Sequence, residues 1–137
     1  MKIVIGCDPD AKAHGIAIYY DGVLTHLKSM DTLELYEHLK PLKAKAESIR
    51  ANVENVKARR AAWHGGGVGG AIDVGKCHQA QTELERVFKA LDIPVKLCGI
   101  SKRWKSQAEK KQFQLATGWK GKSNEDTRSA AWFGFAG

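Results

Sequence analysis

Residues 2–20 read KIVIGCDPDAKAHGIAIYY, and this stretch decides the fold. Its first six residues are an apolar run rich in β-branched side chains, which predicts a buried strand that ends at Asp8-Pro9. Its last six residues predict a second strand. Asp21-Gly22 is the two-residue signal for a tight hairpin, and a third strand over residues 23–28 follows it. The chain therefore opens with an antiparallel meander.

Helices and strands alternate in the rest of the chain. We predict a helix that Asp31 or Thr32 caps and that ends near residue 47, a strand over 48–56, a glycine-rich loop over 57–70, a helix over 71–91, a strand over 93–98, and helices near 106–117 and 124–135. Strands that are reached through helices lie parallel to the first strand. This order predicts an α/β protein with a mixed five-stranded sheet and helices on both faces, which is the order of a ribonuclease H-like fold.

Length and composition set the class of protein. A chain of 137 residues with 43% hydrophobic positions fits one domain, spanning residues 1–137. It has no run of eighteen apolar residues, and acid and proline interrupt the N-terminal stretch, so we expect a soluble intracellular protein with no membrane segment. Three widely spaced cysteines, Cys7, Cys77 and Cys98, are expected to be free thiols.

Positive charge is concentrated in one segment. The chain has 22 Lys and Arg against 15 Asp and Glu, a net charge of +7. Residues 96–122 hold a single acid, Glu109, and eight bases: Lys96, Lys102, Arg103, Lys105, Lys110, Lys111, Lys120 and Lys122. This segment therefore carries the whole excess, which suggests a surface for nucleic acid, although a solvated basic face is the alternative.

Three acidic residues lie at the end of a predicted strand or at the start of a predicted helix. Asp8 ends the first strand, Glu54 lies near the end of the fourth, and Asp126 lies in the first turn of the last helix. Ligands bind at the ends of neighbouring strands in open α/β sheets, so these carboxylates can converge. A pair of Mg²⁺ ions would relieve their repulsion and activate water against a phosphodiester. Taken singly, each acid also fits a turn, a solvated position or a helix cap.

Short motifs along nearly the whole chain resemble those of RuvC-type Holliday-junction resolvases. Gly6–Asp10 followed by His14–Ala17 is similar to the first motif of that family, and Val53–Asn55 to the second. Residues 108–113 resemble its basic helix, and residues 126–131 its C-terminal acidic helix. The order and spacing of these motifs are more specific than any one of them.

The resemblance implies a metal-dependent endonuclease that resolves four-way DNA junctions in DNA recombination and repair. It implies that Asp8, Glu54 and Asp126 hold two Mg²⁺ ions, with Mn²⁺ as a substitute, and that Lys110 or Lys111 approaches the scissile phosphate. The residues expected to contact DNA are Arg59, Arg60, Trp63, Lys102, Arg103, Lys105 and Lys111. A core position is the alternative for Trp63. The expected location is the cytoplasm of a bacterium or of a phage-infected bacterial cell.

Resolution needs two symmetric cuts, so a homodimer is implied. We predict that the apolar face of the 71–91 helix, with Val87, Phe88 and Leu91, contributes to its interface.

Two departures from the family pattern leave the acid set open. Asp10 stands where the family usually has Gly, and Ser129 stands where a second acid usually follows Asp126 by three residues. Asp10 or Glu125 would then complete the site. Helical phase, with Arg128 outward, favours Asp126 over Glu125 as the inward acid.

The missing acid also motivates a second hypothesis, a nucleic-acid-binding module without catalysis. An actin-like sugar kinase or ATPase is a weaker third reading, because 137 residues lack its second domain.

Overall fold

The computed structural model describes the backbone of residues 1–58 and 67–137 and the side chains of residues 1–58 and 74–137. In this part of the chain, five strands form one sheet in the order β3-β2-β1-β4-β5. The strands are β1 (Lys2–Asp8), β2 (His14–Tyr20), β3 (Val23–Met30), β4 (Ser48–Glu54) and β5 (Val95–Cys98). The helices are α1 (Thr32–Lys45), α2 (Gly67–Ala90), α3 (Lys110–Thr117) and α4 (Glu125–Ala136), with short 3-10 turns at Val56–Ala58 and Gln107–Glu109.

The strand directions confirm the predicted mixed sheet. β2 pairs antiparallel with both β1 and β3, while β4 runs parallel to β1 and β5 runs parallel to β4. Asp21 and Gly22 form the hairpin turn with φ values of 48° and 84°, the left-handed backbone that an Asp-Gly pair tolerates. The sheet therefore has the predicted α/β topology.

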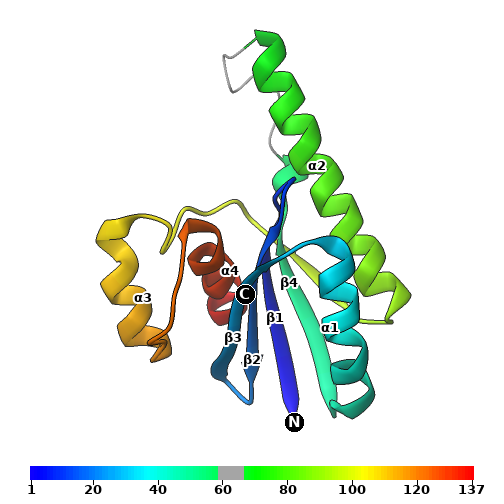
Figure 1. The fold of residues 1–137 in the computed structure, drawn as a ribbon, viewed down its shortest axis with the longest axis vertical. Coiled ribbons are helices and arrows are strands. Elements are labelled where there is room, and N and C mark those ends of the chain that lie inside the picture. Colours follow the sequence, from blue (N-terminus) through cyan, green and yellow to red (C-terminus); the bar gives the residue numbers. More distant parts are fainter. Residues whose placement is uncertain (59–66) are drawn as a thin grey trace.

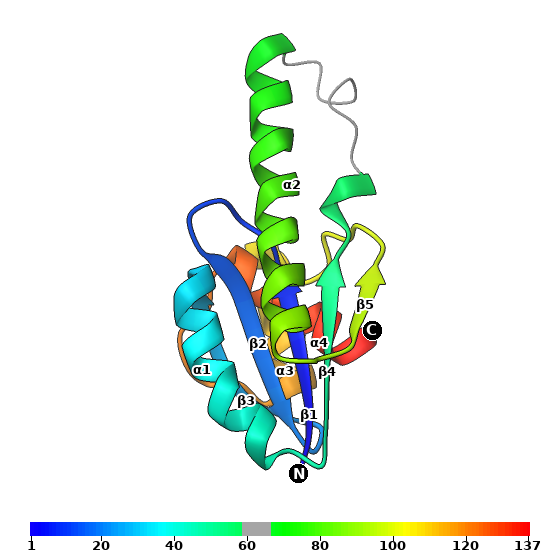
Figure 2. The same ribbon diagram turned by 90° about the vertical axis from the view of Figure 1, so that its right-hand side faces the viewer.

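The two faces of the sheet carry different layers. Helices α1 and α2 cover one face, and α4 lies against the other with α3 beyond it (Figures 1 and 2). Ile3, Ile5 and Cys7 of β1 belong to the hydrophobic cluster under α1 and α2. Because successive residues of a strand point to opposite faces, the intervening residues, which end in Asp8, face α4.

Two glycines allow α4 to lie directly on the sheet. A Cβ at Gly6 would be 2.0 Å from the carbonyl oxygen of Ala130, and one at Gly15 would be 2.2 Å from that of Asp126. Neither position can therefore hold a larger residue without moving the helix. The approach at Gly15 fixes the first turn of α4 above the end of β1, because Gly15 pairs with Asp8.

Helix α2 corrects two predictions. It begins at Gly67, so the expected loop over 57–70 is too long at its end. Glycine has low helix propensity, but tertiary packing elsewhere along a helix can outweigh the propensity of its first residues. Val87 and Phe88 are only 6% and 0% exposed and lie in the chain's own core, so the predicted dimer face is wrong. Among the described residues, no helix is long and apolar enough to cross a membrane.

Candidate active site

Asp8 and Glu54 lie side by side at the ends of two parallel strands. Cys7 of β1 is in register with Val53 of β4, so the next residue along each strand is an acid. Asn52, two residues before Glu54, donates a hydrogen bond of 2.9 Å to a carbonyl of α4, which shows that this set of β4 side chains faces α4. Asp8 and Glu54 are 4% and 5% exposed. Both carboxylates therefore lie on the α4 face, largely removed from water.

Asp126 comes to the same place from the first turn of α4. Asn124 caps this helix: its side chain accepts a hydrogen bond of 2.9 Å from the backbone N–H of Thr127, whose hydroxyl accepts one of 2.9 Å from the Asn124 N–H. This reciprocal cap fixes where the helix starts. The close approach at Gly15 then places Asp126 beside Asp8.

The ammonium of Lys105 connects the two aspartates. Its Nζ is 3.3 Å from Oδ2 of Asp8 and 3.5 Å from Oδ1 of Asp126. Burial raises the pKa of Asp8 and the nearby Asp126 carboxylate raises it further, while Lys105 opposes both. Burial would lower the pKa of Lys105, but Asp8, Asp126 and Glu54 outweigh it and raise that pKa. The lysine therefore stays charged between the carboxylates.

A buried arginine holds the loop that carries Lys105. Trp104 has φ of 65°, a left-handed conformation that costs energy in a non-glycine residue, and is 2% exposed. Its ring contacts those of Phe113, Trp132 and Phe135, at centroid distances of 5.6, 5.2 and 5.3 Å. Arg128 donates hydrogen bonds of 2.9 Å to the carbonyl of Trp104, 2.7 Å to that of Lys105 and 3.2 Å to the hydroxyl of Ser123.

The expectation that Arg128 points outward is wrong. It is 3% exposed, because the carbonyls of the folded-back loop satisfy its guanidinium inside the protein.

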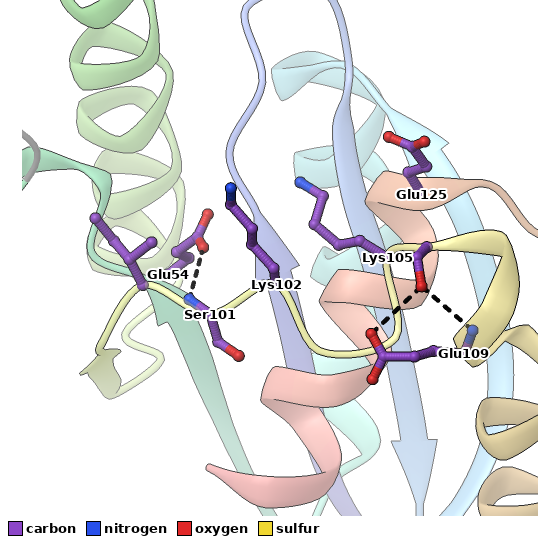
Figure 3. Close-up of a pocket in the computed structure, with 8 residues that line it drawn as sticks. Glu54, Ser101, Lys102, Lys105, Glu109 and Glu125 are labelled. Carbon is purple, nitrogen blue, oxygen red and sulfur yellow. Dashed lines mark hydrogen bonds between the residues drawn. The ribbon is translucent and has the colours of Figure 1, made fainter. Parts of the chain in front are cut away.

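A pocket of about 420 Å³ opens beside these residues (Figure 3). Its lining residues are Glu54, Ile100, Ser101, Lys102, Lys105, Ser106, Glu109 and Glu125. Lys102 and Lys105 extend between Glu54 on one side and Glu125 on the other (Figure 3). The backbone N–H of Ser101 donates to Oε2 of Glu54 at 3.4 Å. The pocket thus presents cations next to carboxylates, a surface that suits a phosphate and its counter-ions.

Solved structures share this fold although sequence comparison finds no relative. No protein family model and no curated protein matches the sequence. Thermus thermophilus RuvC in complex with Holliday junction substrate superposes with a TM-score of 0.63 at 12% identity, over 98% of this chain and 92% of that chain. A second T. thermophilus RuvC structure gives 0.60 at 16% identity, over 97% and 91%. The chain has the RuvC fold. The predicted ribonuclease H-like class is therefore confirmed.

The acidic side chains of the described residues are not grouped as a metal site. Across residues 1–58 and 74–137, no three His, Cys, Asp or Glu side chains are grouped so that they could hold one metal ion. The cation between Asp8 and Asp126 is the Lys105 ammonium instead.

The two candidates for a fourth acid lie in different pockets of the RuvC-like fold. Glu125 lines the pocket that contains Glu54. Asp10 lines a separate pocket, and its Oδ1 accepts a hydrogen bond of 2.9 Å from the backbone N–H of Lys12. Ser129 is fully buried, and its hydroxyl helps to lower the pKa of Asp8. Glu125 is thus the better placed candidate.

The predicted DNA contacts fall into three groups. Lys102 is exposed at the pocket, and Arg103 pairs with Glu109 at 3.4 Å while its guanidinium lies 4.6 Å from the Trp132 ring centroid. Lys110 and Lys111 occupy the first turn of α3. Arg59, Arg60 and Trp63 lie outside the described residues.

Two residues of the site were not assigned their structural role from sequence. Lys105 was expected on the DNA surface but contacts the carboxylates. Arg128 was expected in solvent, although its small neighbours Ser129, Ala130 and Ala131 mark a closely packed helix face and could have indicated its burial.

Proposed function

We propose that the chain is a metal-dependent endonuclease that cuts branched DNA, four-way junctions above all, by attack of water on a phosphodiester. The observation that carries the proposal is the convergence of Asp8 and Asp126, from opposite ends of the sequence, on one cation beside Glu54. The fold supports it, because a solved T. thermophilus RuvC with the same architecture is a complex with Holliday junction substrate.

The donor chemistry at this position fits a divalent cation. Asp8, Glu54 and Asp126 bring three carboxyl groups to one end of the sheet, and the Lys105 ammonium lies against two of them. Carboxylate oxygens are the ligands that Mg²⁺ and Mn²⁺ prefer. We propose that these three residues hold two such ions once Lys105 moves away. Ions bound there would supply an activated water and would stabilise the leaving oxygen.

The basic residues of the pocket bind and orient the DNA backbone. Lys105 is 30% exposed, so its ammonium can turn from the carboxylates to a phosphate oxygen in the pocket. Lys102, which is exposed beside it, would contact a neighbouring phosphate. Lys110 or Lys111 of α3 stays the predicted contact to the scissile phosphate, and Arg59, Arg60 and Trp63 stay predicted DNA contacts.

Two opposed cuts require two active sites, so we propose a homodimer. Val87 and Phe88 are excluded from its interface by their burial in the core. On a junction carried in a supercoiled plasmid, paired sites give linear product with little nicked circle.

The test is cleavage of a synthetic four-way junction with and without Mg²⁺, with a linear duplex of the same arm sequence as the control. We expect Mg²⁺-dependent cutting of the junction and far slower cutting of the duplex. Absence of cutting in both Mg²⁺ and Mn²⁺, with the junction bound, would contradict the proposal.

That second outcome is what a non-catalytic junction-binding module would give. Two observations favour this alternative: Ser129 stands in place of an acid, and Lys105 already compensates the aspartates.

A further inference from the structure

We propose that His14 is a positioning residue for Asp8, acting through the loop that joins β1 to β2. The inference builds on the proposed function, since it assigns a supporting residue to the same site. His14 begins β2 on the sheet face that α1 and α2 cover, opposite the face of Asp8. It therefore acts without touching the reacting atoms.

His14 fixes the loop directly. The backbone N–H of Asp10 donates a hydrogen bond of 3.3 Å to Nδ1 of His14, whose side chain is only 2% exposed. Asp10 follows Asp8 by two residues, and the intervening Pro9 has no N–H of its own. The N–H of Asp10 is thus the first backbone donor after Asp8, and His14 holds it.

The other ring nitrogen extends the anchor to both helices. Because Nδ1 accepts, the proton of the neutral ring lies on Nε2, which donates to Oγ1 of Thr32 at 3.0 Å. The Thr32 hydroxyl in turn donates to Oε2 of Glu83 at 3.0 Å. Burial lowers the pKa of His14, which keeps the ring neutral as this chain of bonds requires.

The result is one directed chain of hydrogen bonds through four segments. It runs from the loop after Asp8 to β2, then to the first residue of α1, and ends on α2. His14 also precedes Gly15, the partner of Asp8 in the sheet. The end of β1 is therefore fixed from its own loop and from the neighbouring strand by the same residue.

A matched pair of variants separates positioning from stability. His14→Asn keeps an acceptor near Nδ1 but loses the bond to Thr32, and His14→Gln keeps a donor near Nε2 but loses the bond to Asp10. We expect His14→Gln to lower kcat and Mn²⁺ affinity about tenfold, a loss typical of residues that support metal ligands. His14→Asn should keep both values within about twofold of the wild type. KM for the junction is expected to stay unchanged in both.

Two structural readouts accompany the kinetics. Each variant loses one part-buried hydrogen bond, so their Tm values should fall alike. Exchange of the Asp10 amide hydrogen should speed up in His14→Gln only. Equal losses of kcat in the two variants, or losses that follow the Tm, would overturn the inference. A wild-type protein that cuts no junction would instead overturn the proposed function, so the two failures are distinguishable.

Discussion

The two faces of the sheet differ in what they bury. The face under α1 and α2 packs an apolar cluster that contains Ile5, Leu39, Leu84 and Phe88, all 0% exposed. Each side also buries polar side chains: His14 and Gln81 on the side of α1 and α2, and the larger and more highly charged set Asp8, Asn52, Glu54, Thr127, Arg128 and Ser129 on the side of α4. Burial of charged groups costs stability unless they are paired. We infer that the first face provides most of the stability and that the second holds the proposed chemistry.

The difference between the faces can be tested with one destabilising substitution on each face. Phe88→Ala should lower the free energy of unfolding by about 3–5 kcal/mol, because it leaves a cavity in the apolar cluster. Gly15→Ala should cost about 1–3 kcal/mol, because the new Cβ must push α4 away.

Activity should follow the opposite order from stability. Phe88→Ala, measured at a temperature where it is fully folded, should keep the wild-type cleavage rate. Gly15→Ala should lose most of it, since Asp126 moves with α4. Urea titration and junction cleavage measure the two effects. A Gly15→Ala protein that cuts normally would show that the placement of Asp126 does not matter.

An effect on stability of the same order as that of Gly15→Ala is expected from Lys105→Met. Loss of the ammonium leaves Asp8 buried without its cation, which should cost about 1–3 kcal/mol at neutral pH. The cost should shrink as the pH falls. The reason is that burial raises the pKa of Asp8 in the folded protein, so the buried carboxylate takes up a proton there and no longer needs a cation.

Addition of Mg²⁺ to the same variant tests whether Lys105 occupies the position of a metal ion. A bound cation would replace the lost ammonium, so Mg²⁺ should raise the Tm of Lys105→Met more than that of the wild type. Lys102→Met, which removes an exposed lysine from the same pocket, is the matched control and should respond as the wild type does. Equal Mg²⁺ shifts in all three proteins would show that Lys105 does not stand in the position of a metal.

Most of the fold could be predicted because local sequence patterns determine most of its helices and strands. The apolar β-branched run over residues 2–7, the Asp21-Gly22 turn and the Asp31 cap each predicted an element that the structure confirms. The start of α2 could not be predicted, because its glycines favour a loop and the helix depends on packing further along. Periodicity also cannot tell whether Val87 and Phe88 face the chain's own core or a partner.

The candidate site could be predicted only where an acidic residue lies at the end of a strand or in the first turn of a helix. Asp8, Glu54 and Asp126 were identified in this way, and the parallel pairing of β1 with β4 explains why the first two lie together. The roles of Lys105 and Arg128 depend on a loop that folds back through the left-handed Trp104. No spacing rule in the sequence encodes such a long-range contact.

The most direct test of the account compares junction cleavage with junction binding in Asp8→Asn, Glu54→Gln and Asp126→Asn. Each should abolish detectable cleavage in Mg²⁺, while junction affinity stays the same or improves because a repulsive charge is lost. Asp10→Asn and Glu125→Gln are the controls and should be milder. Loss of binding in step with cleavage, or normal cleavage by any of the three variants, would contradict the claim that these carboxylates form the catalytic site.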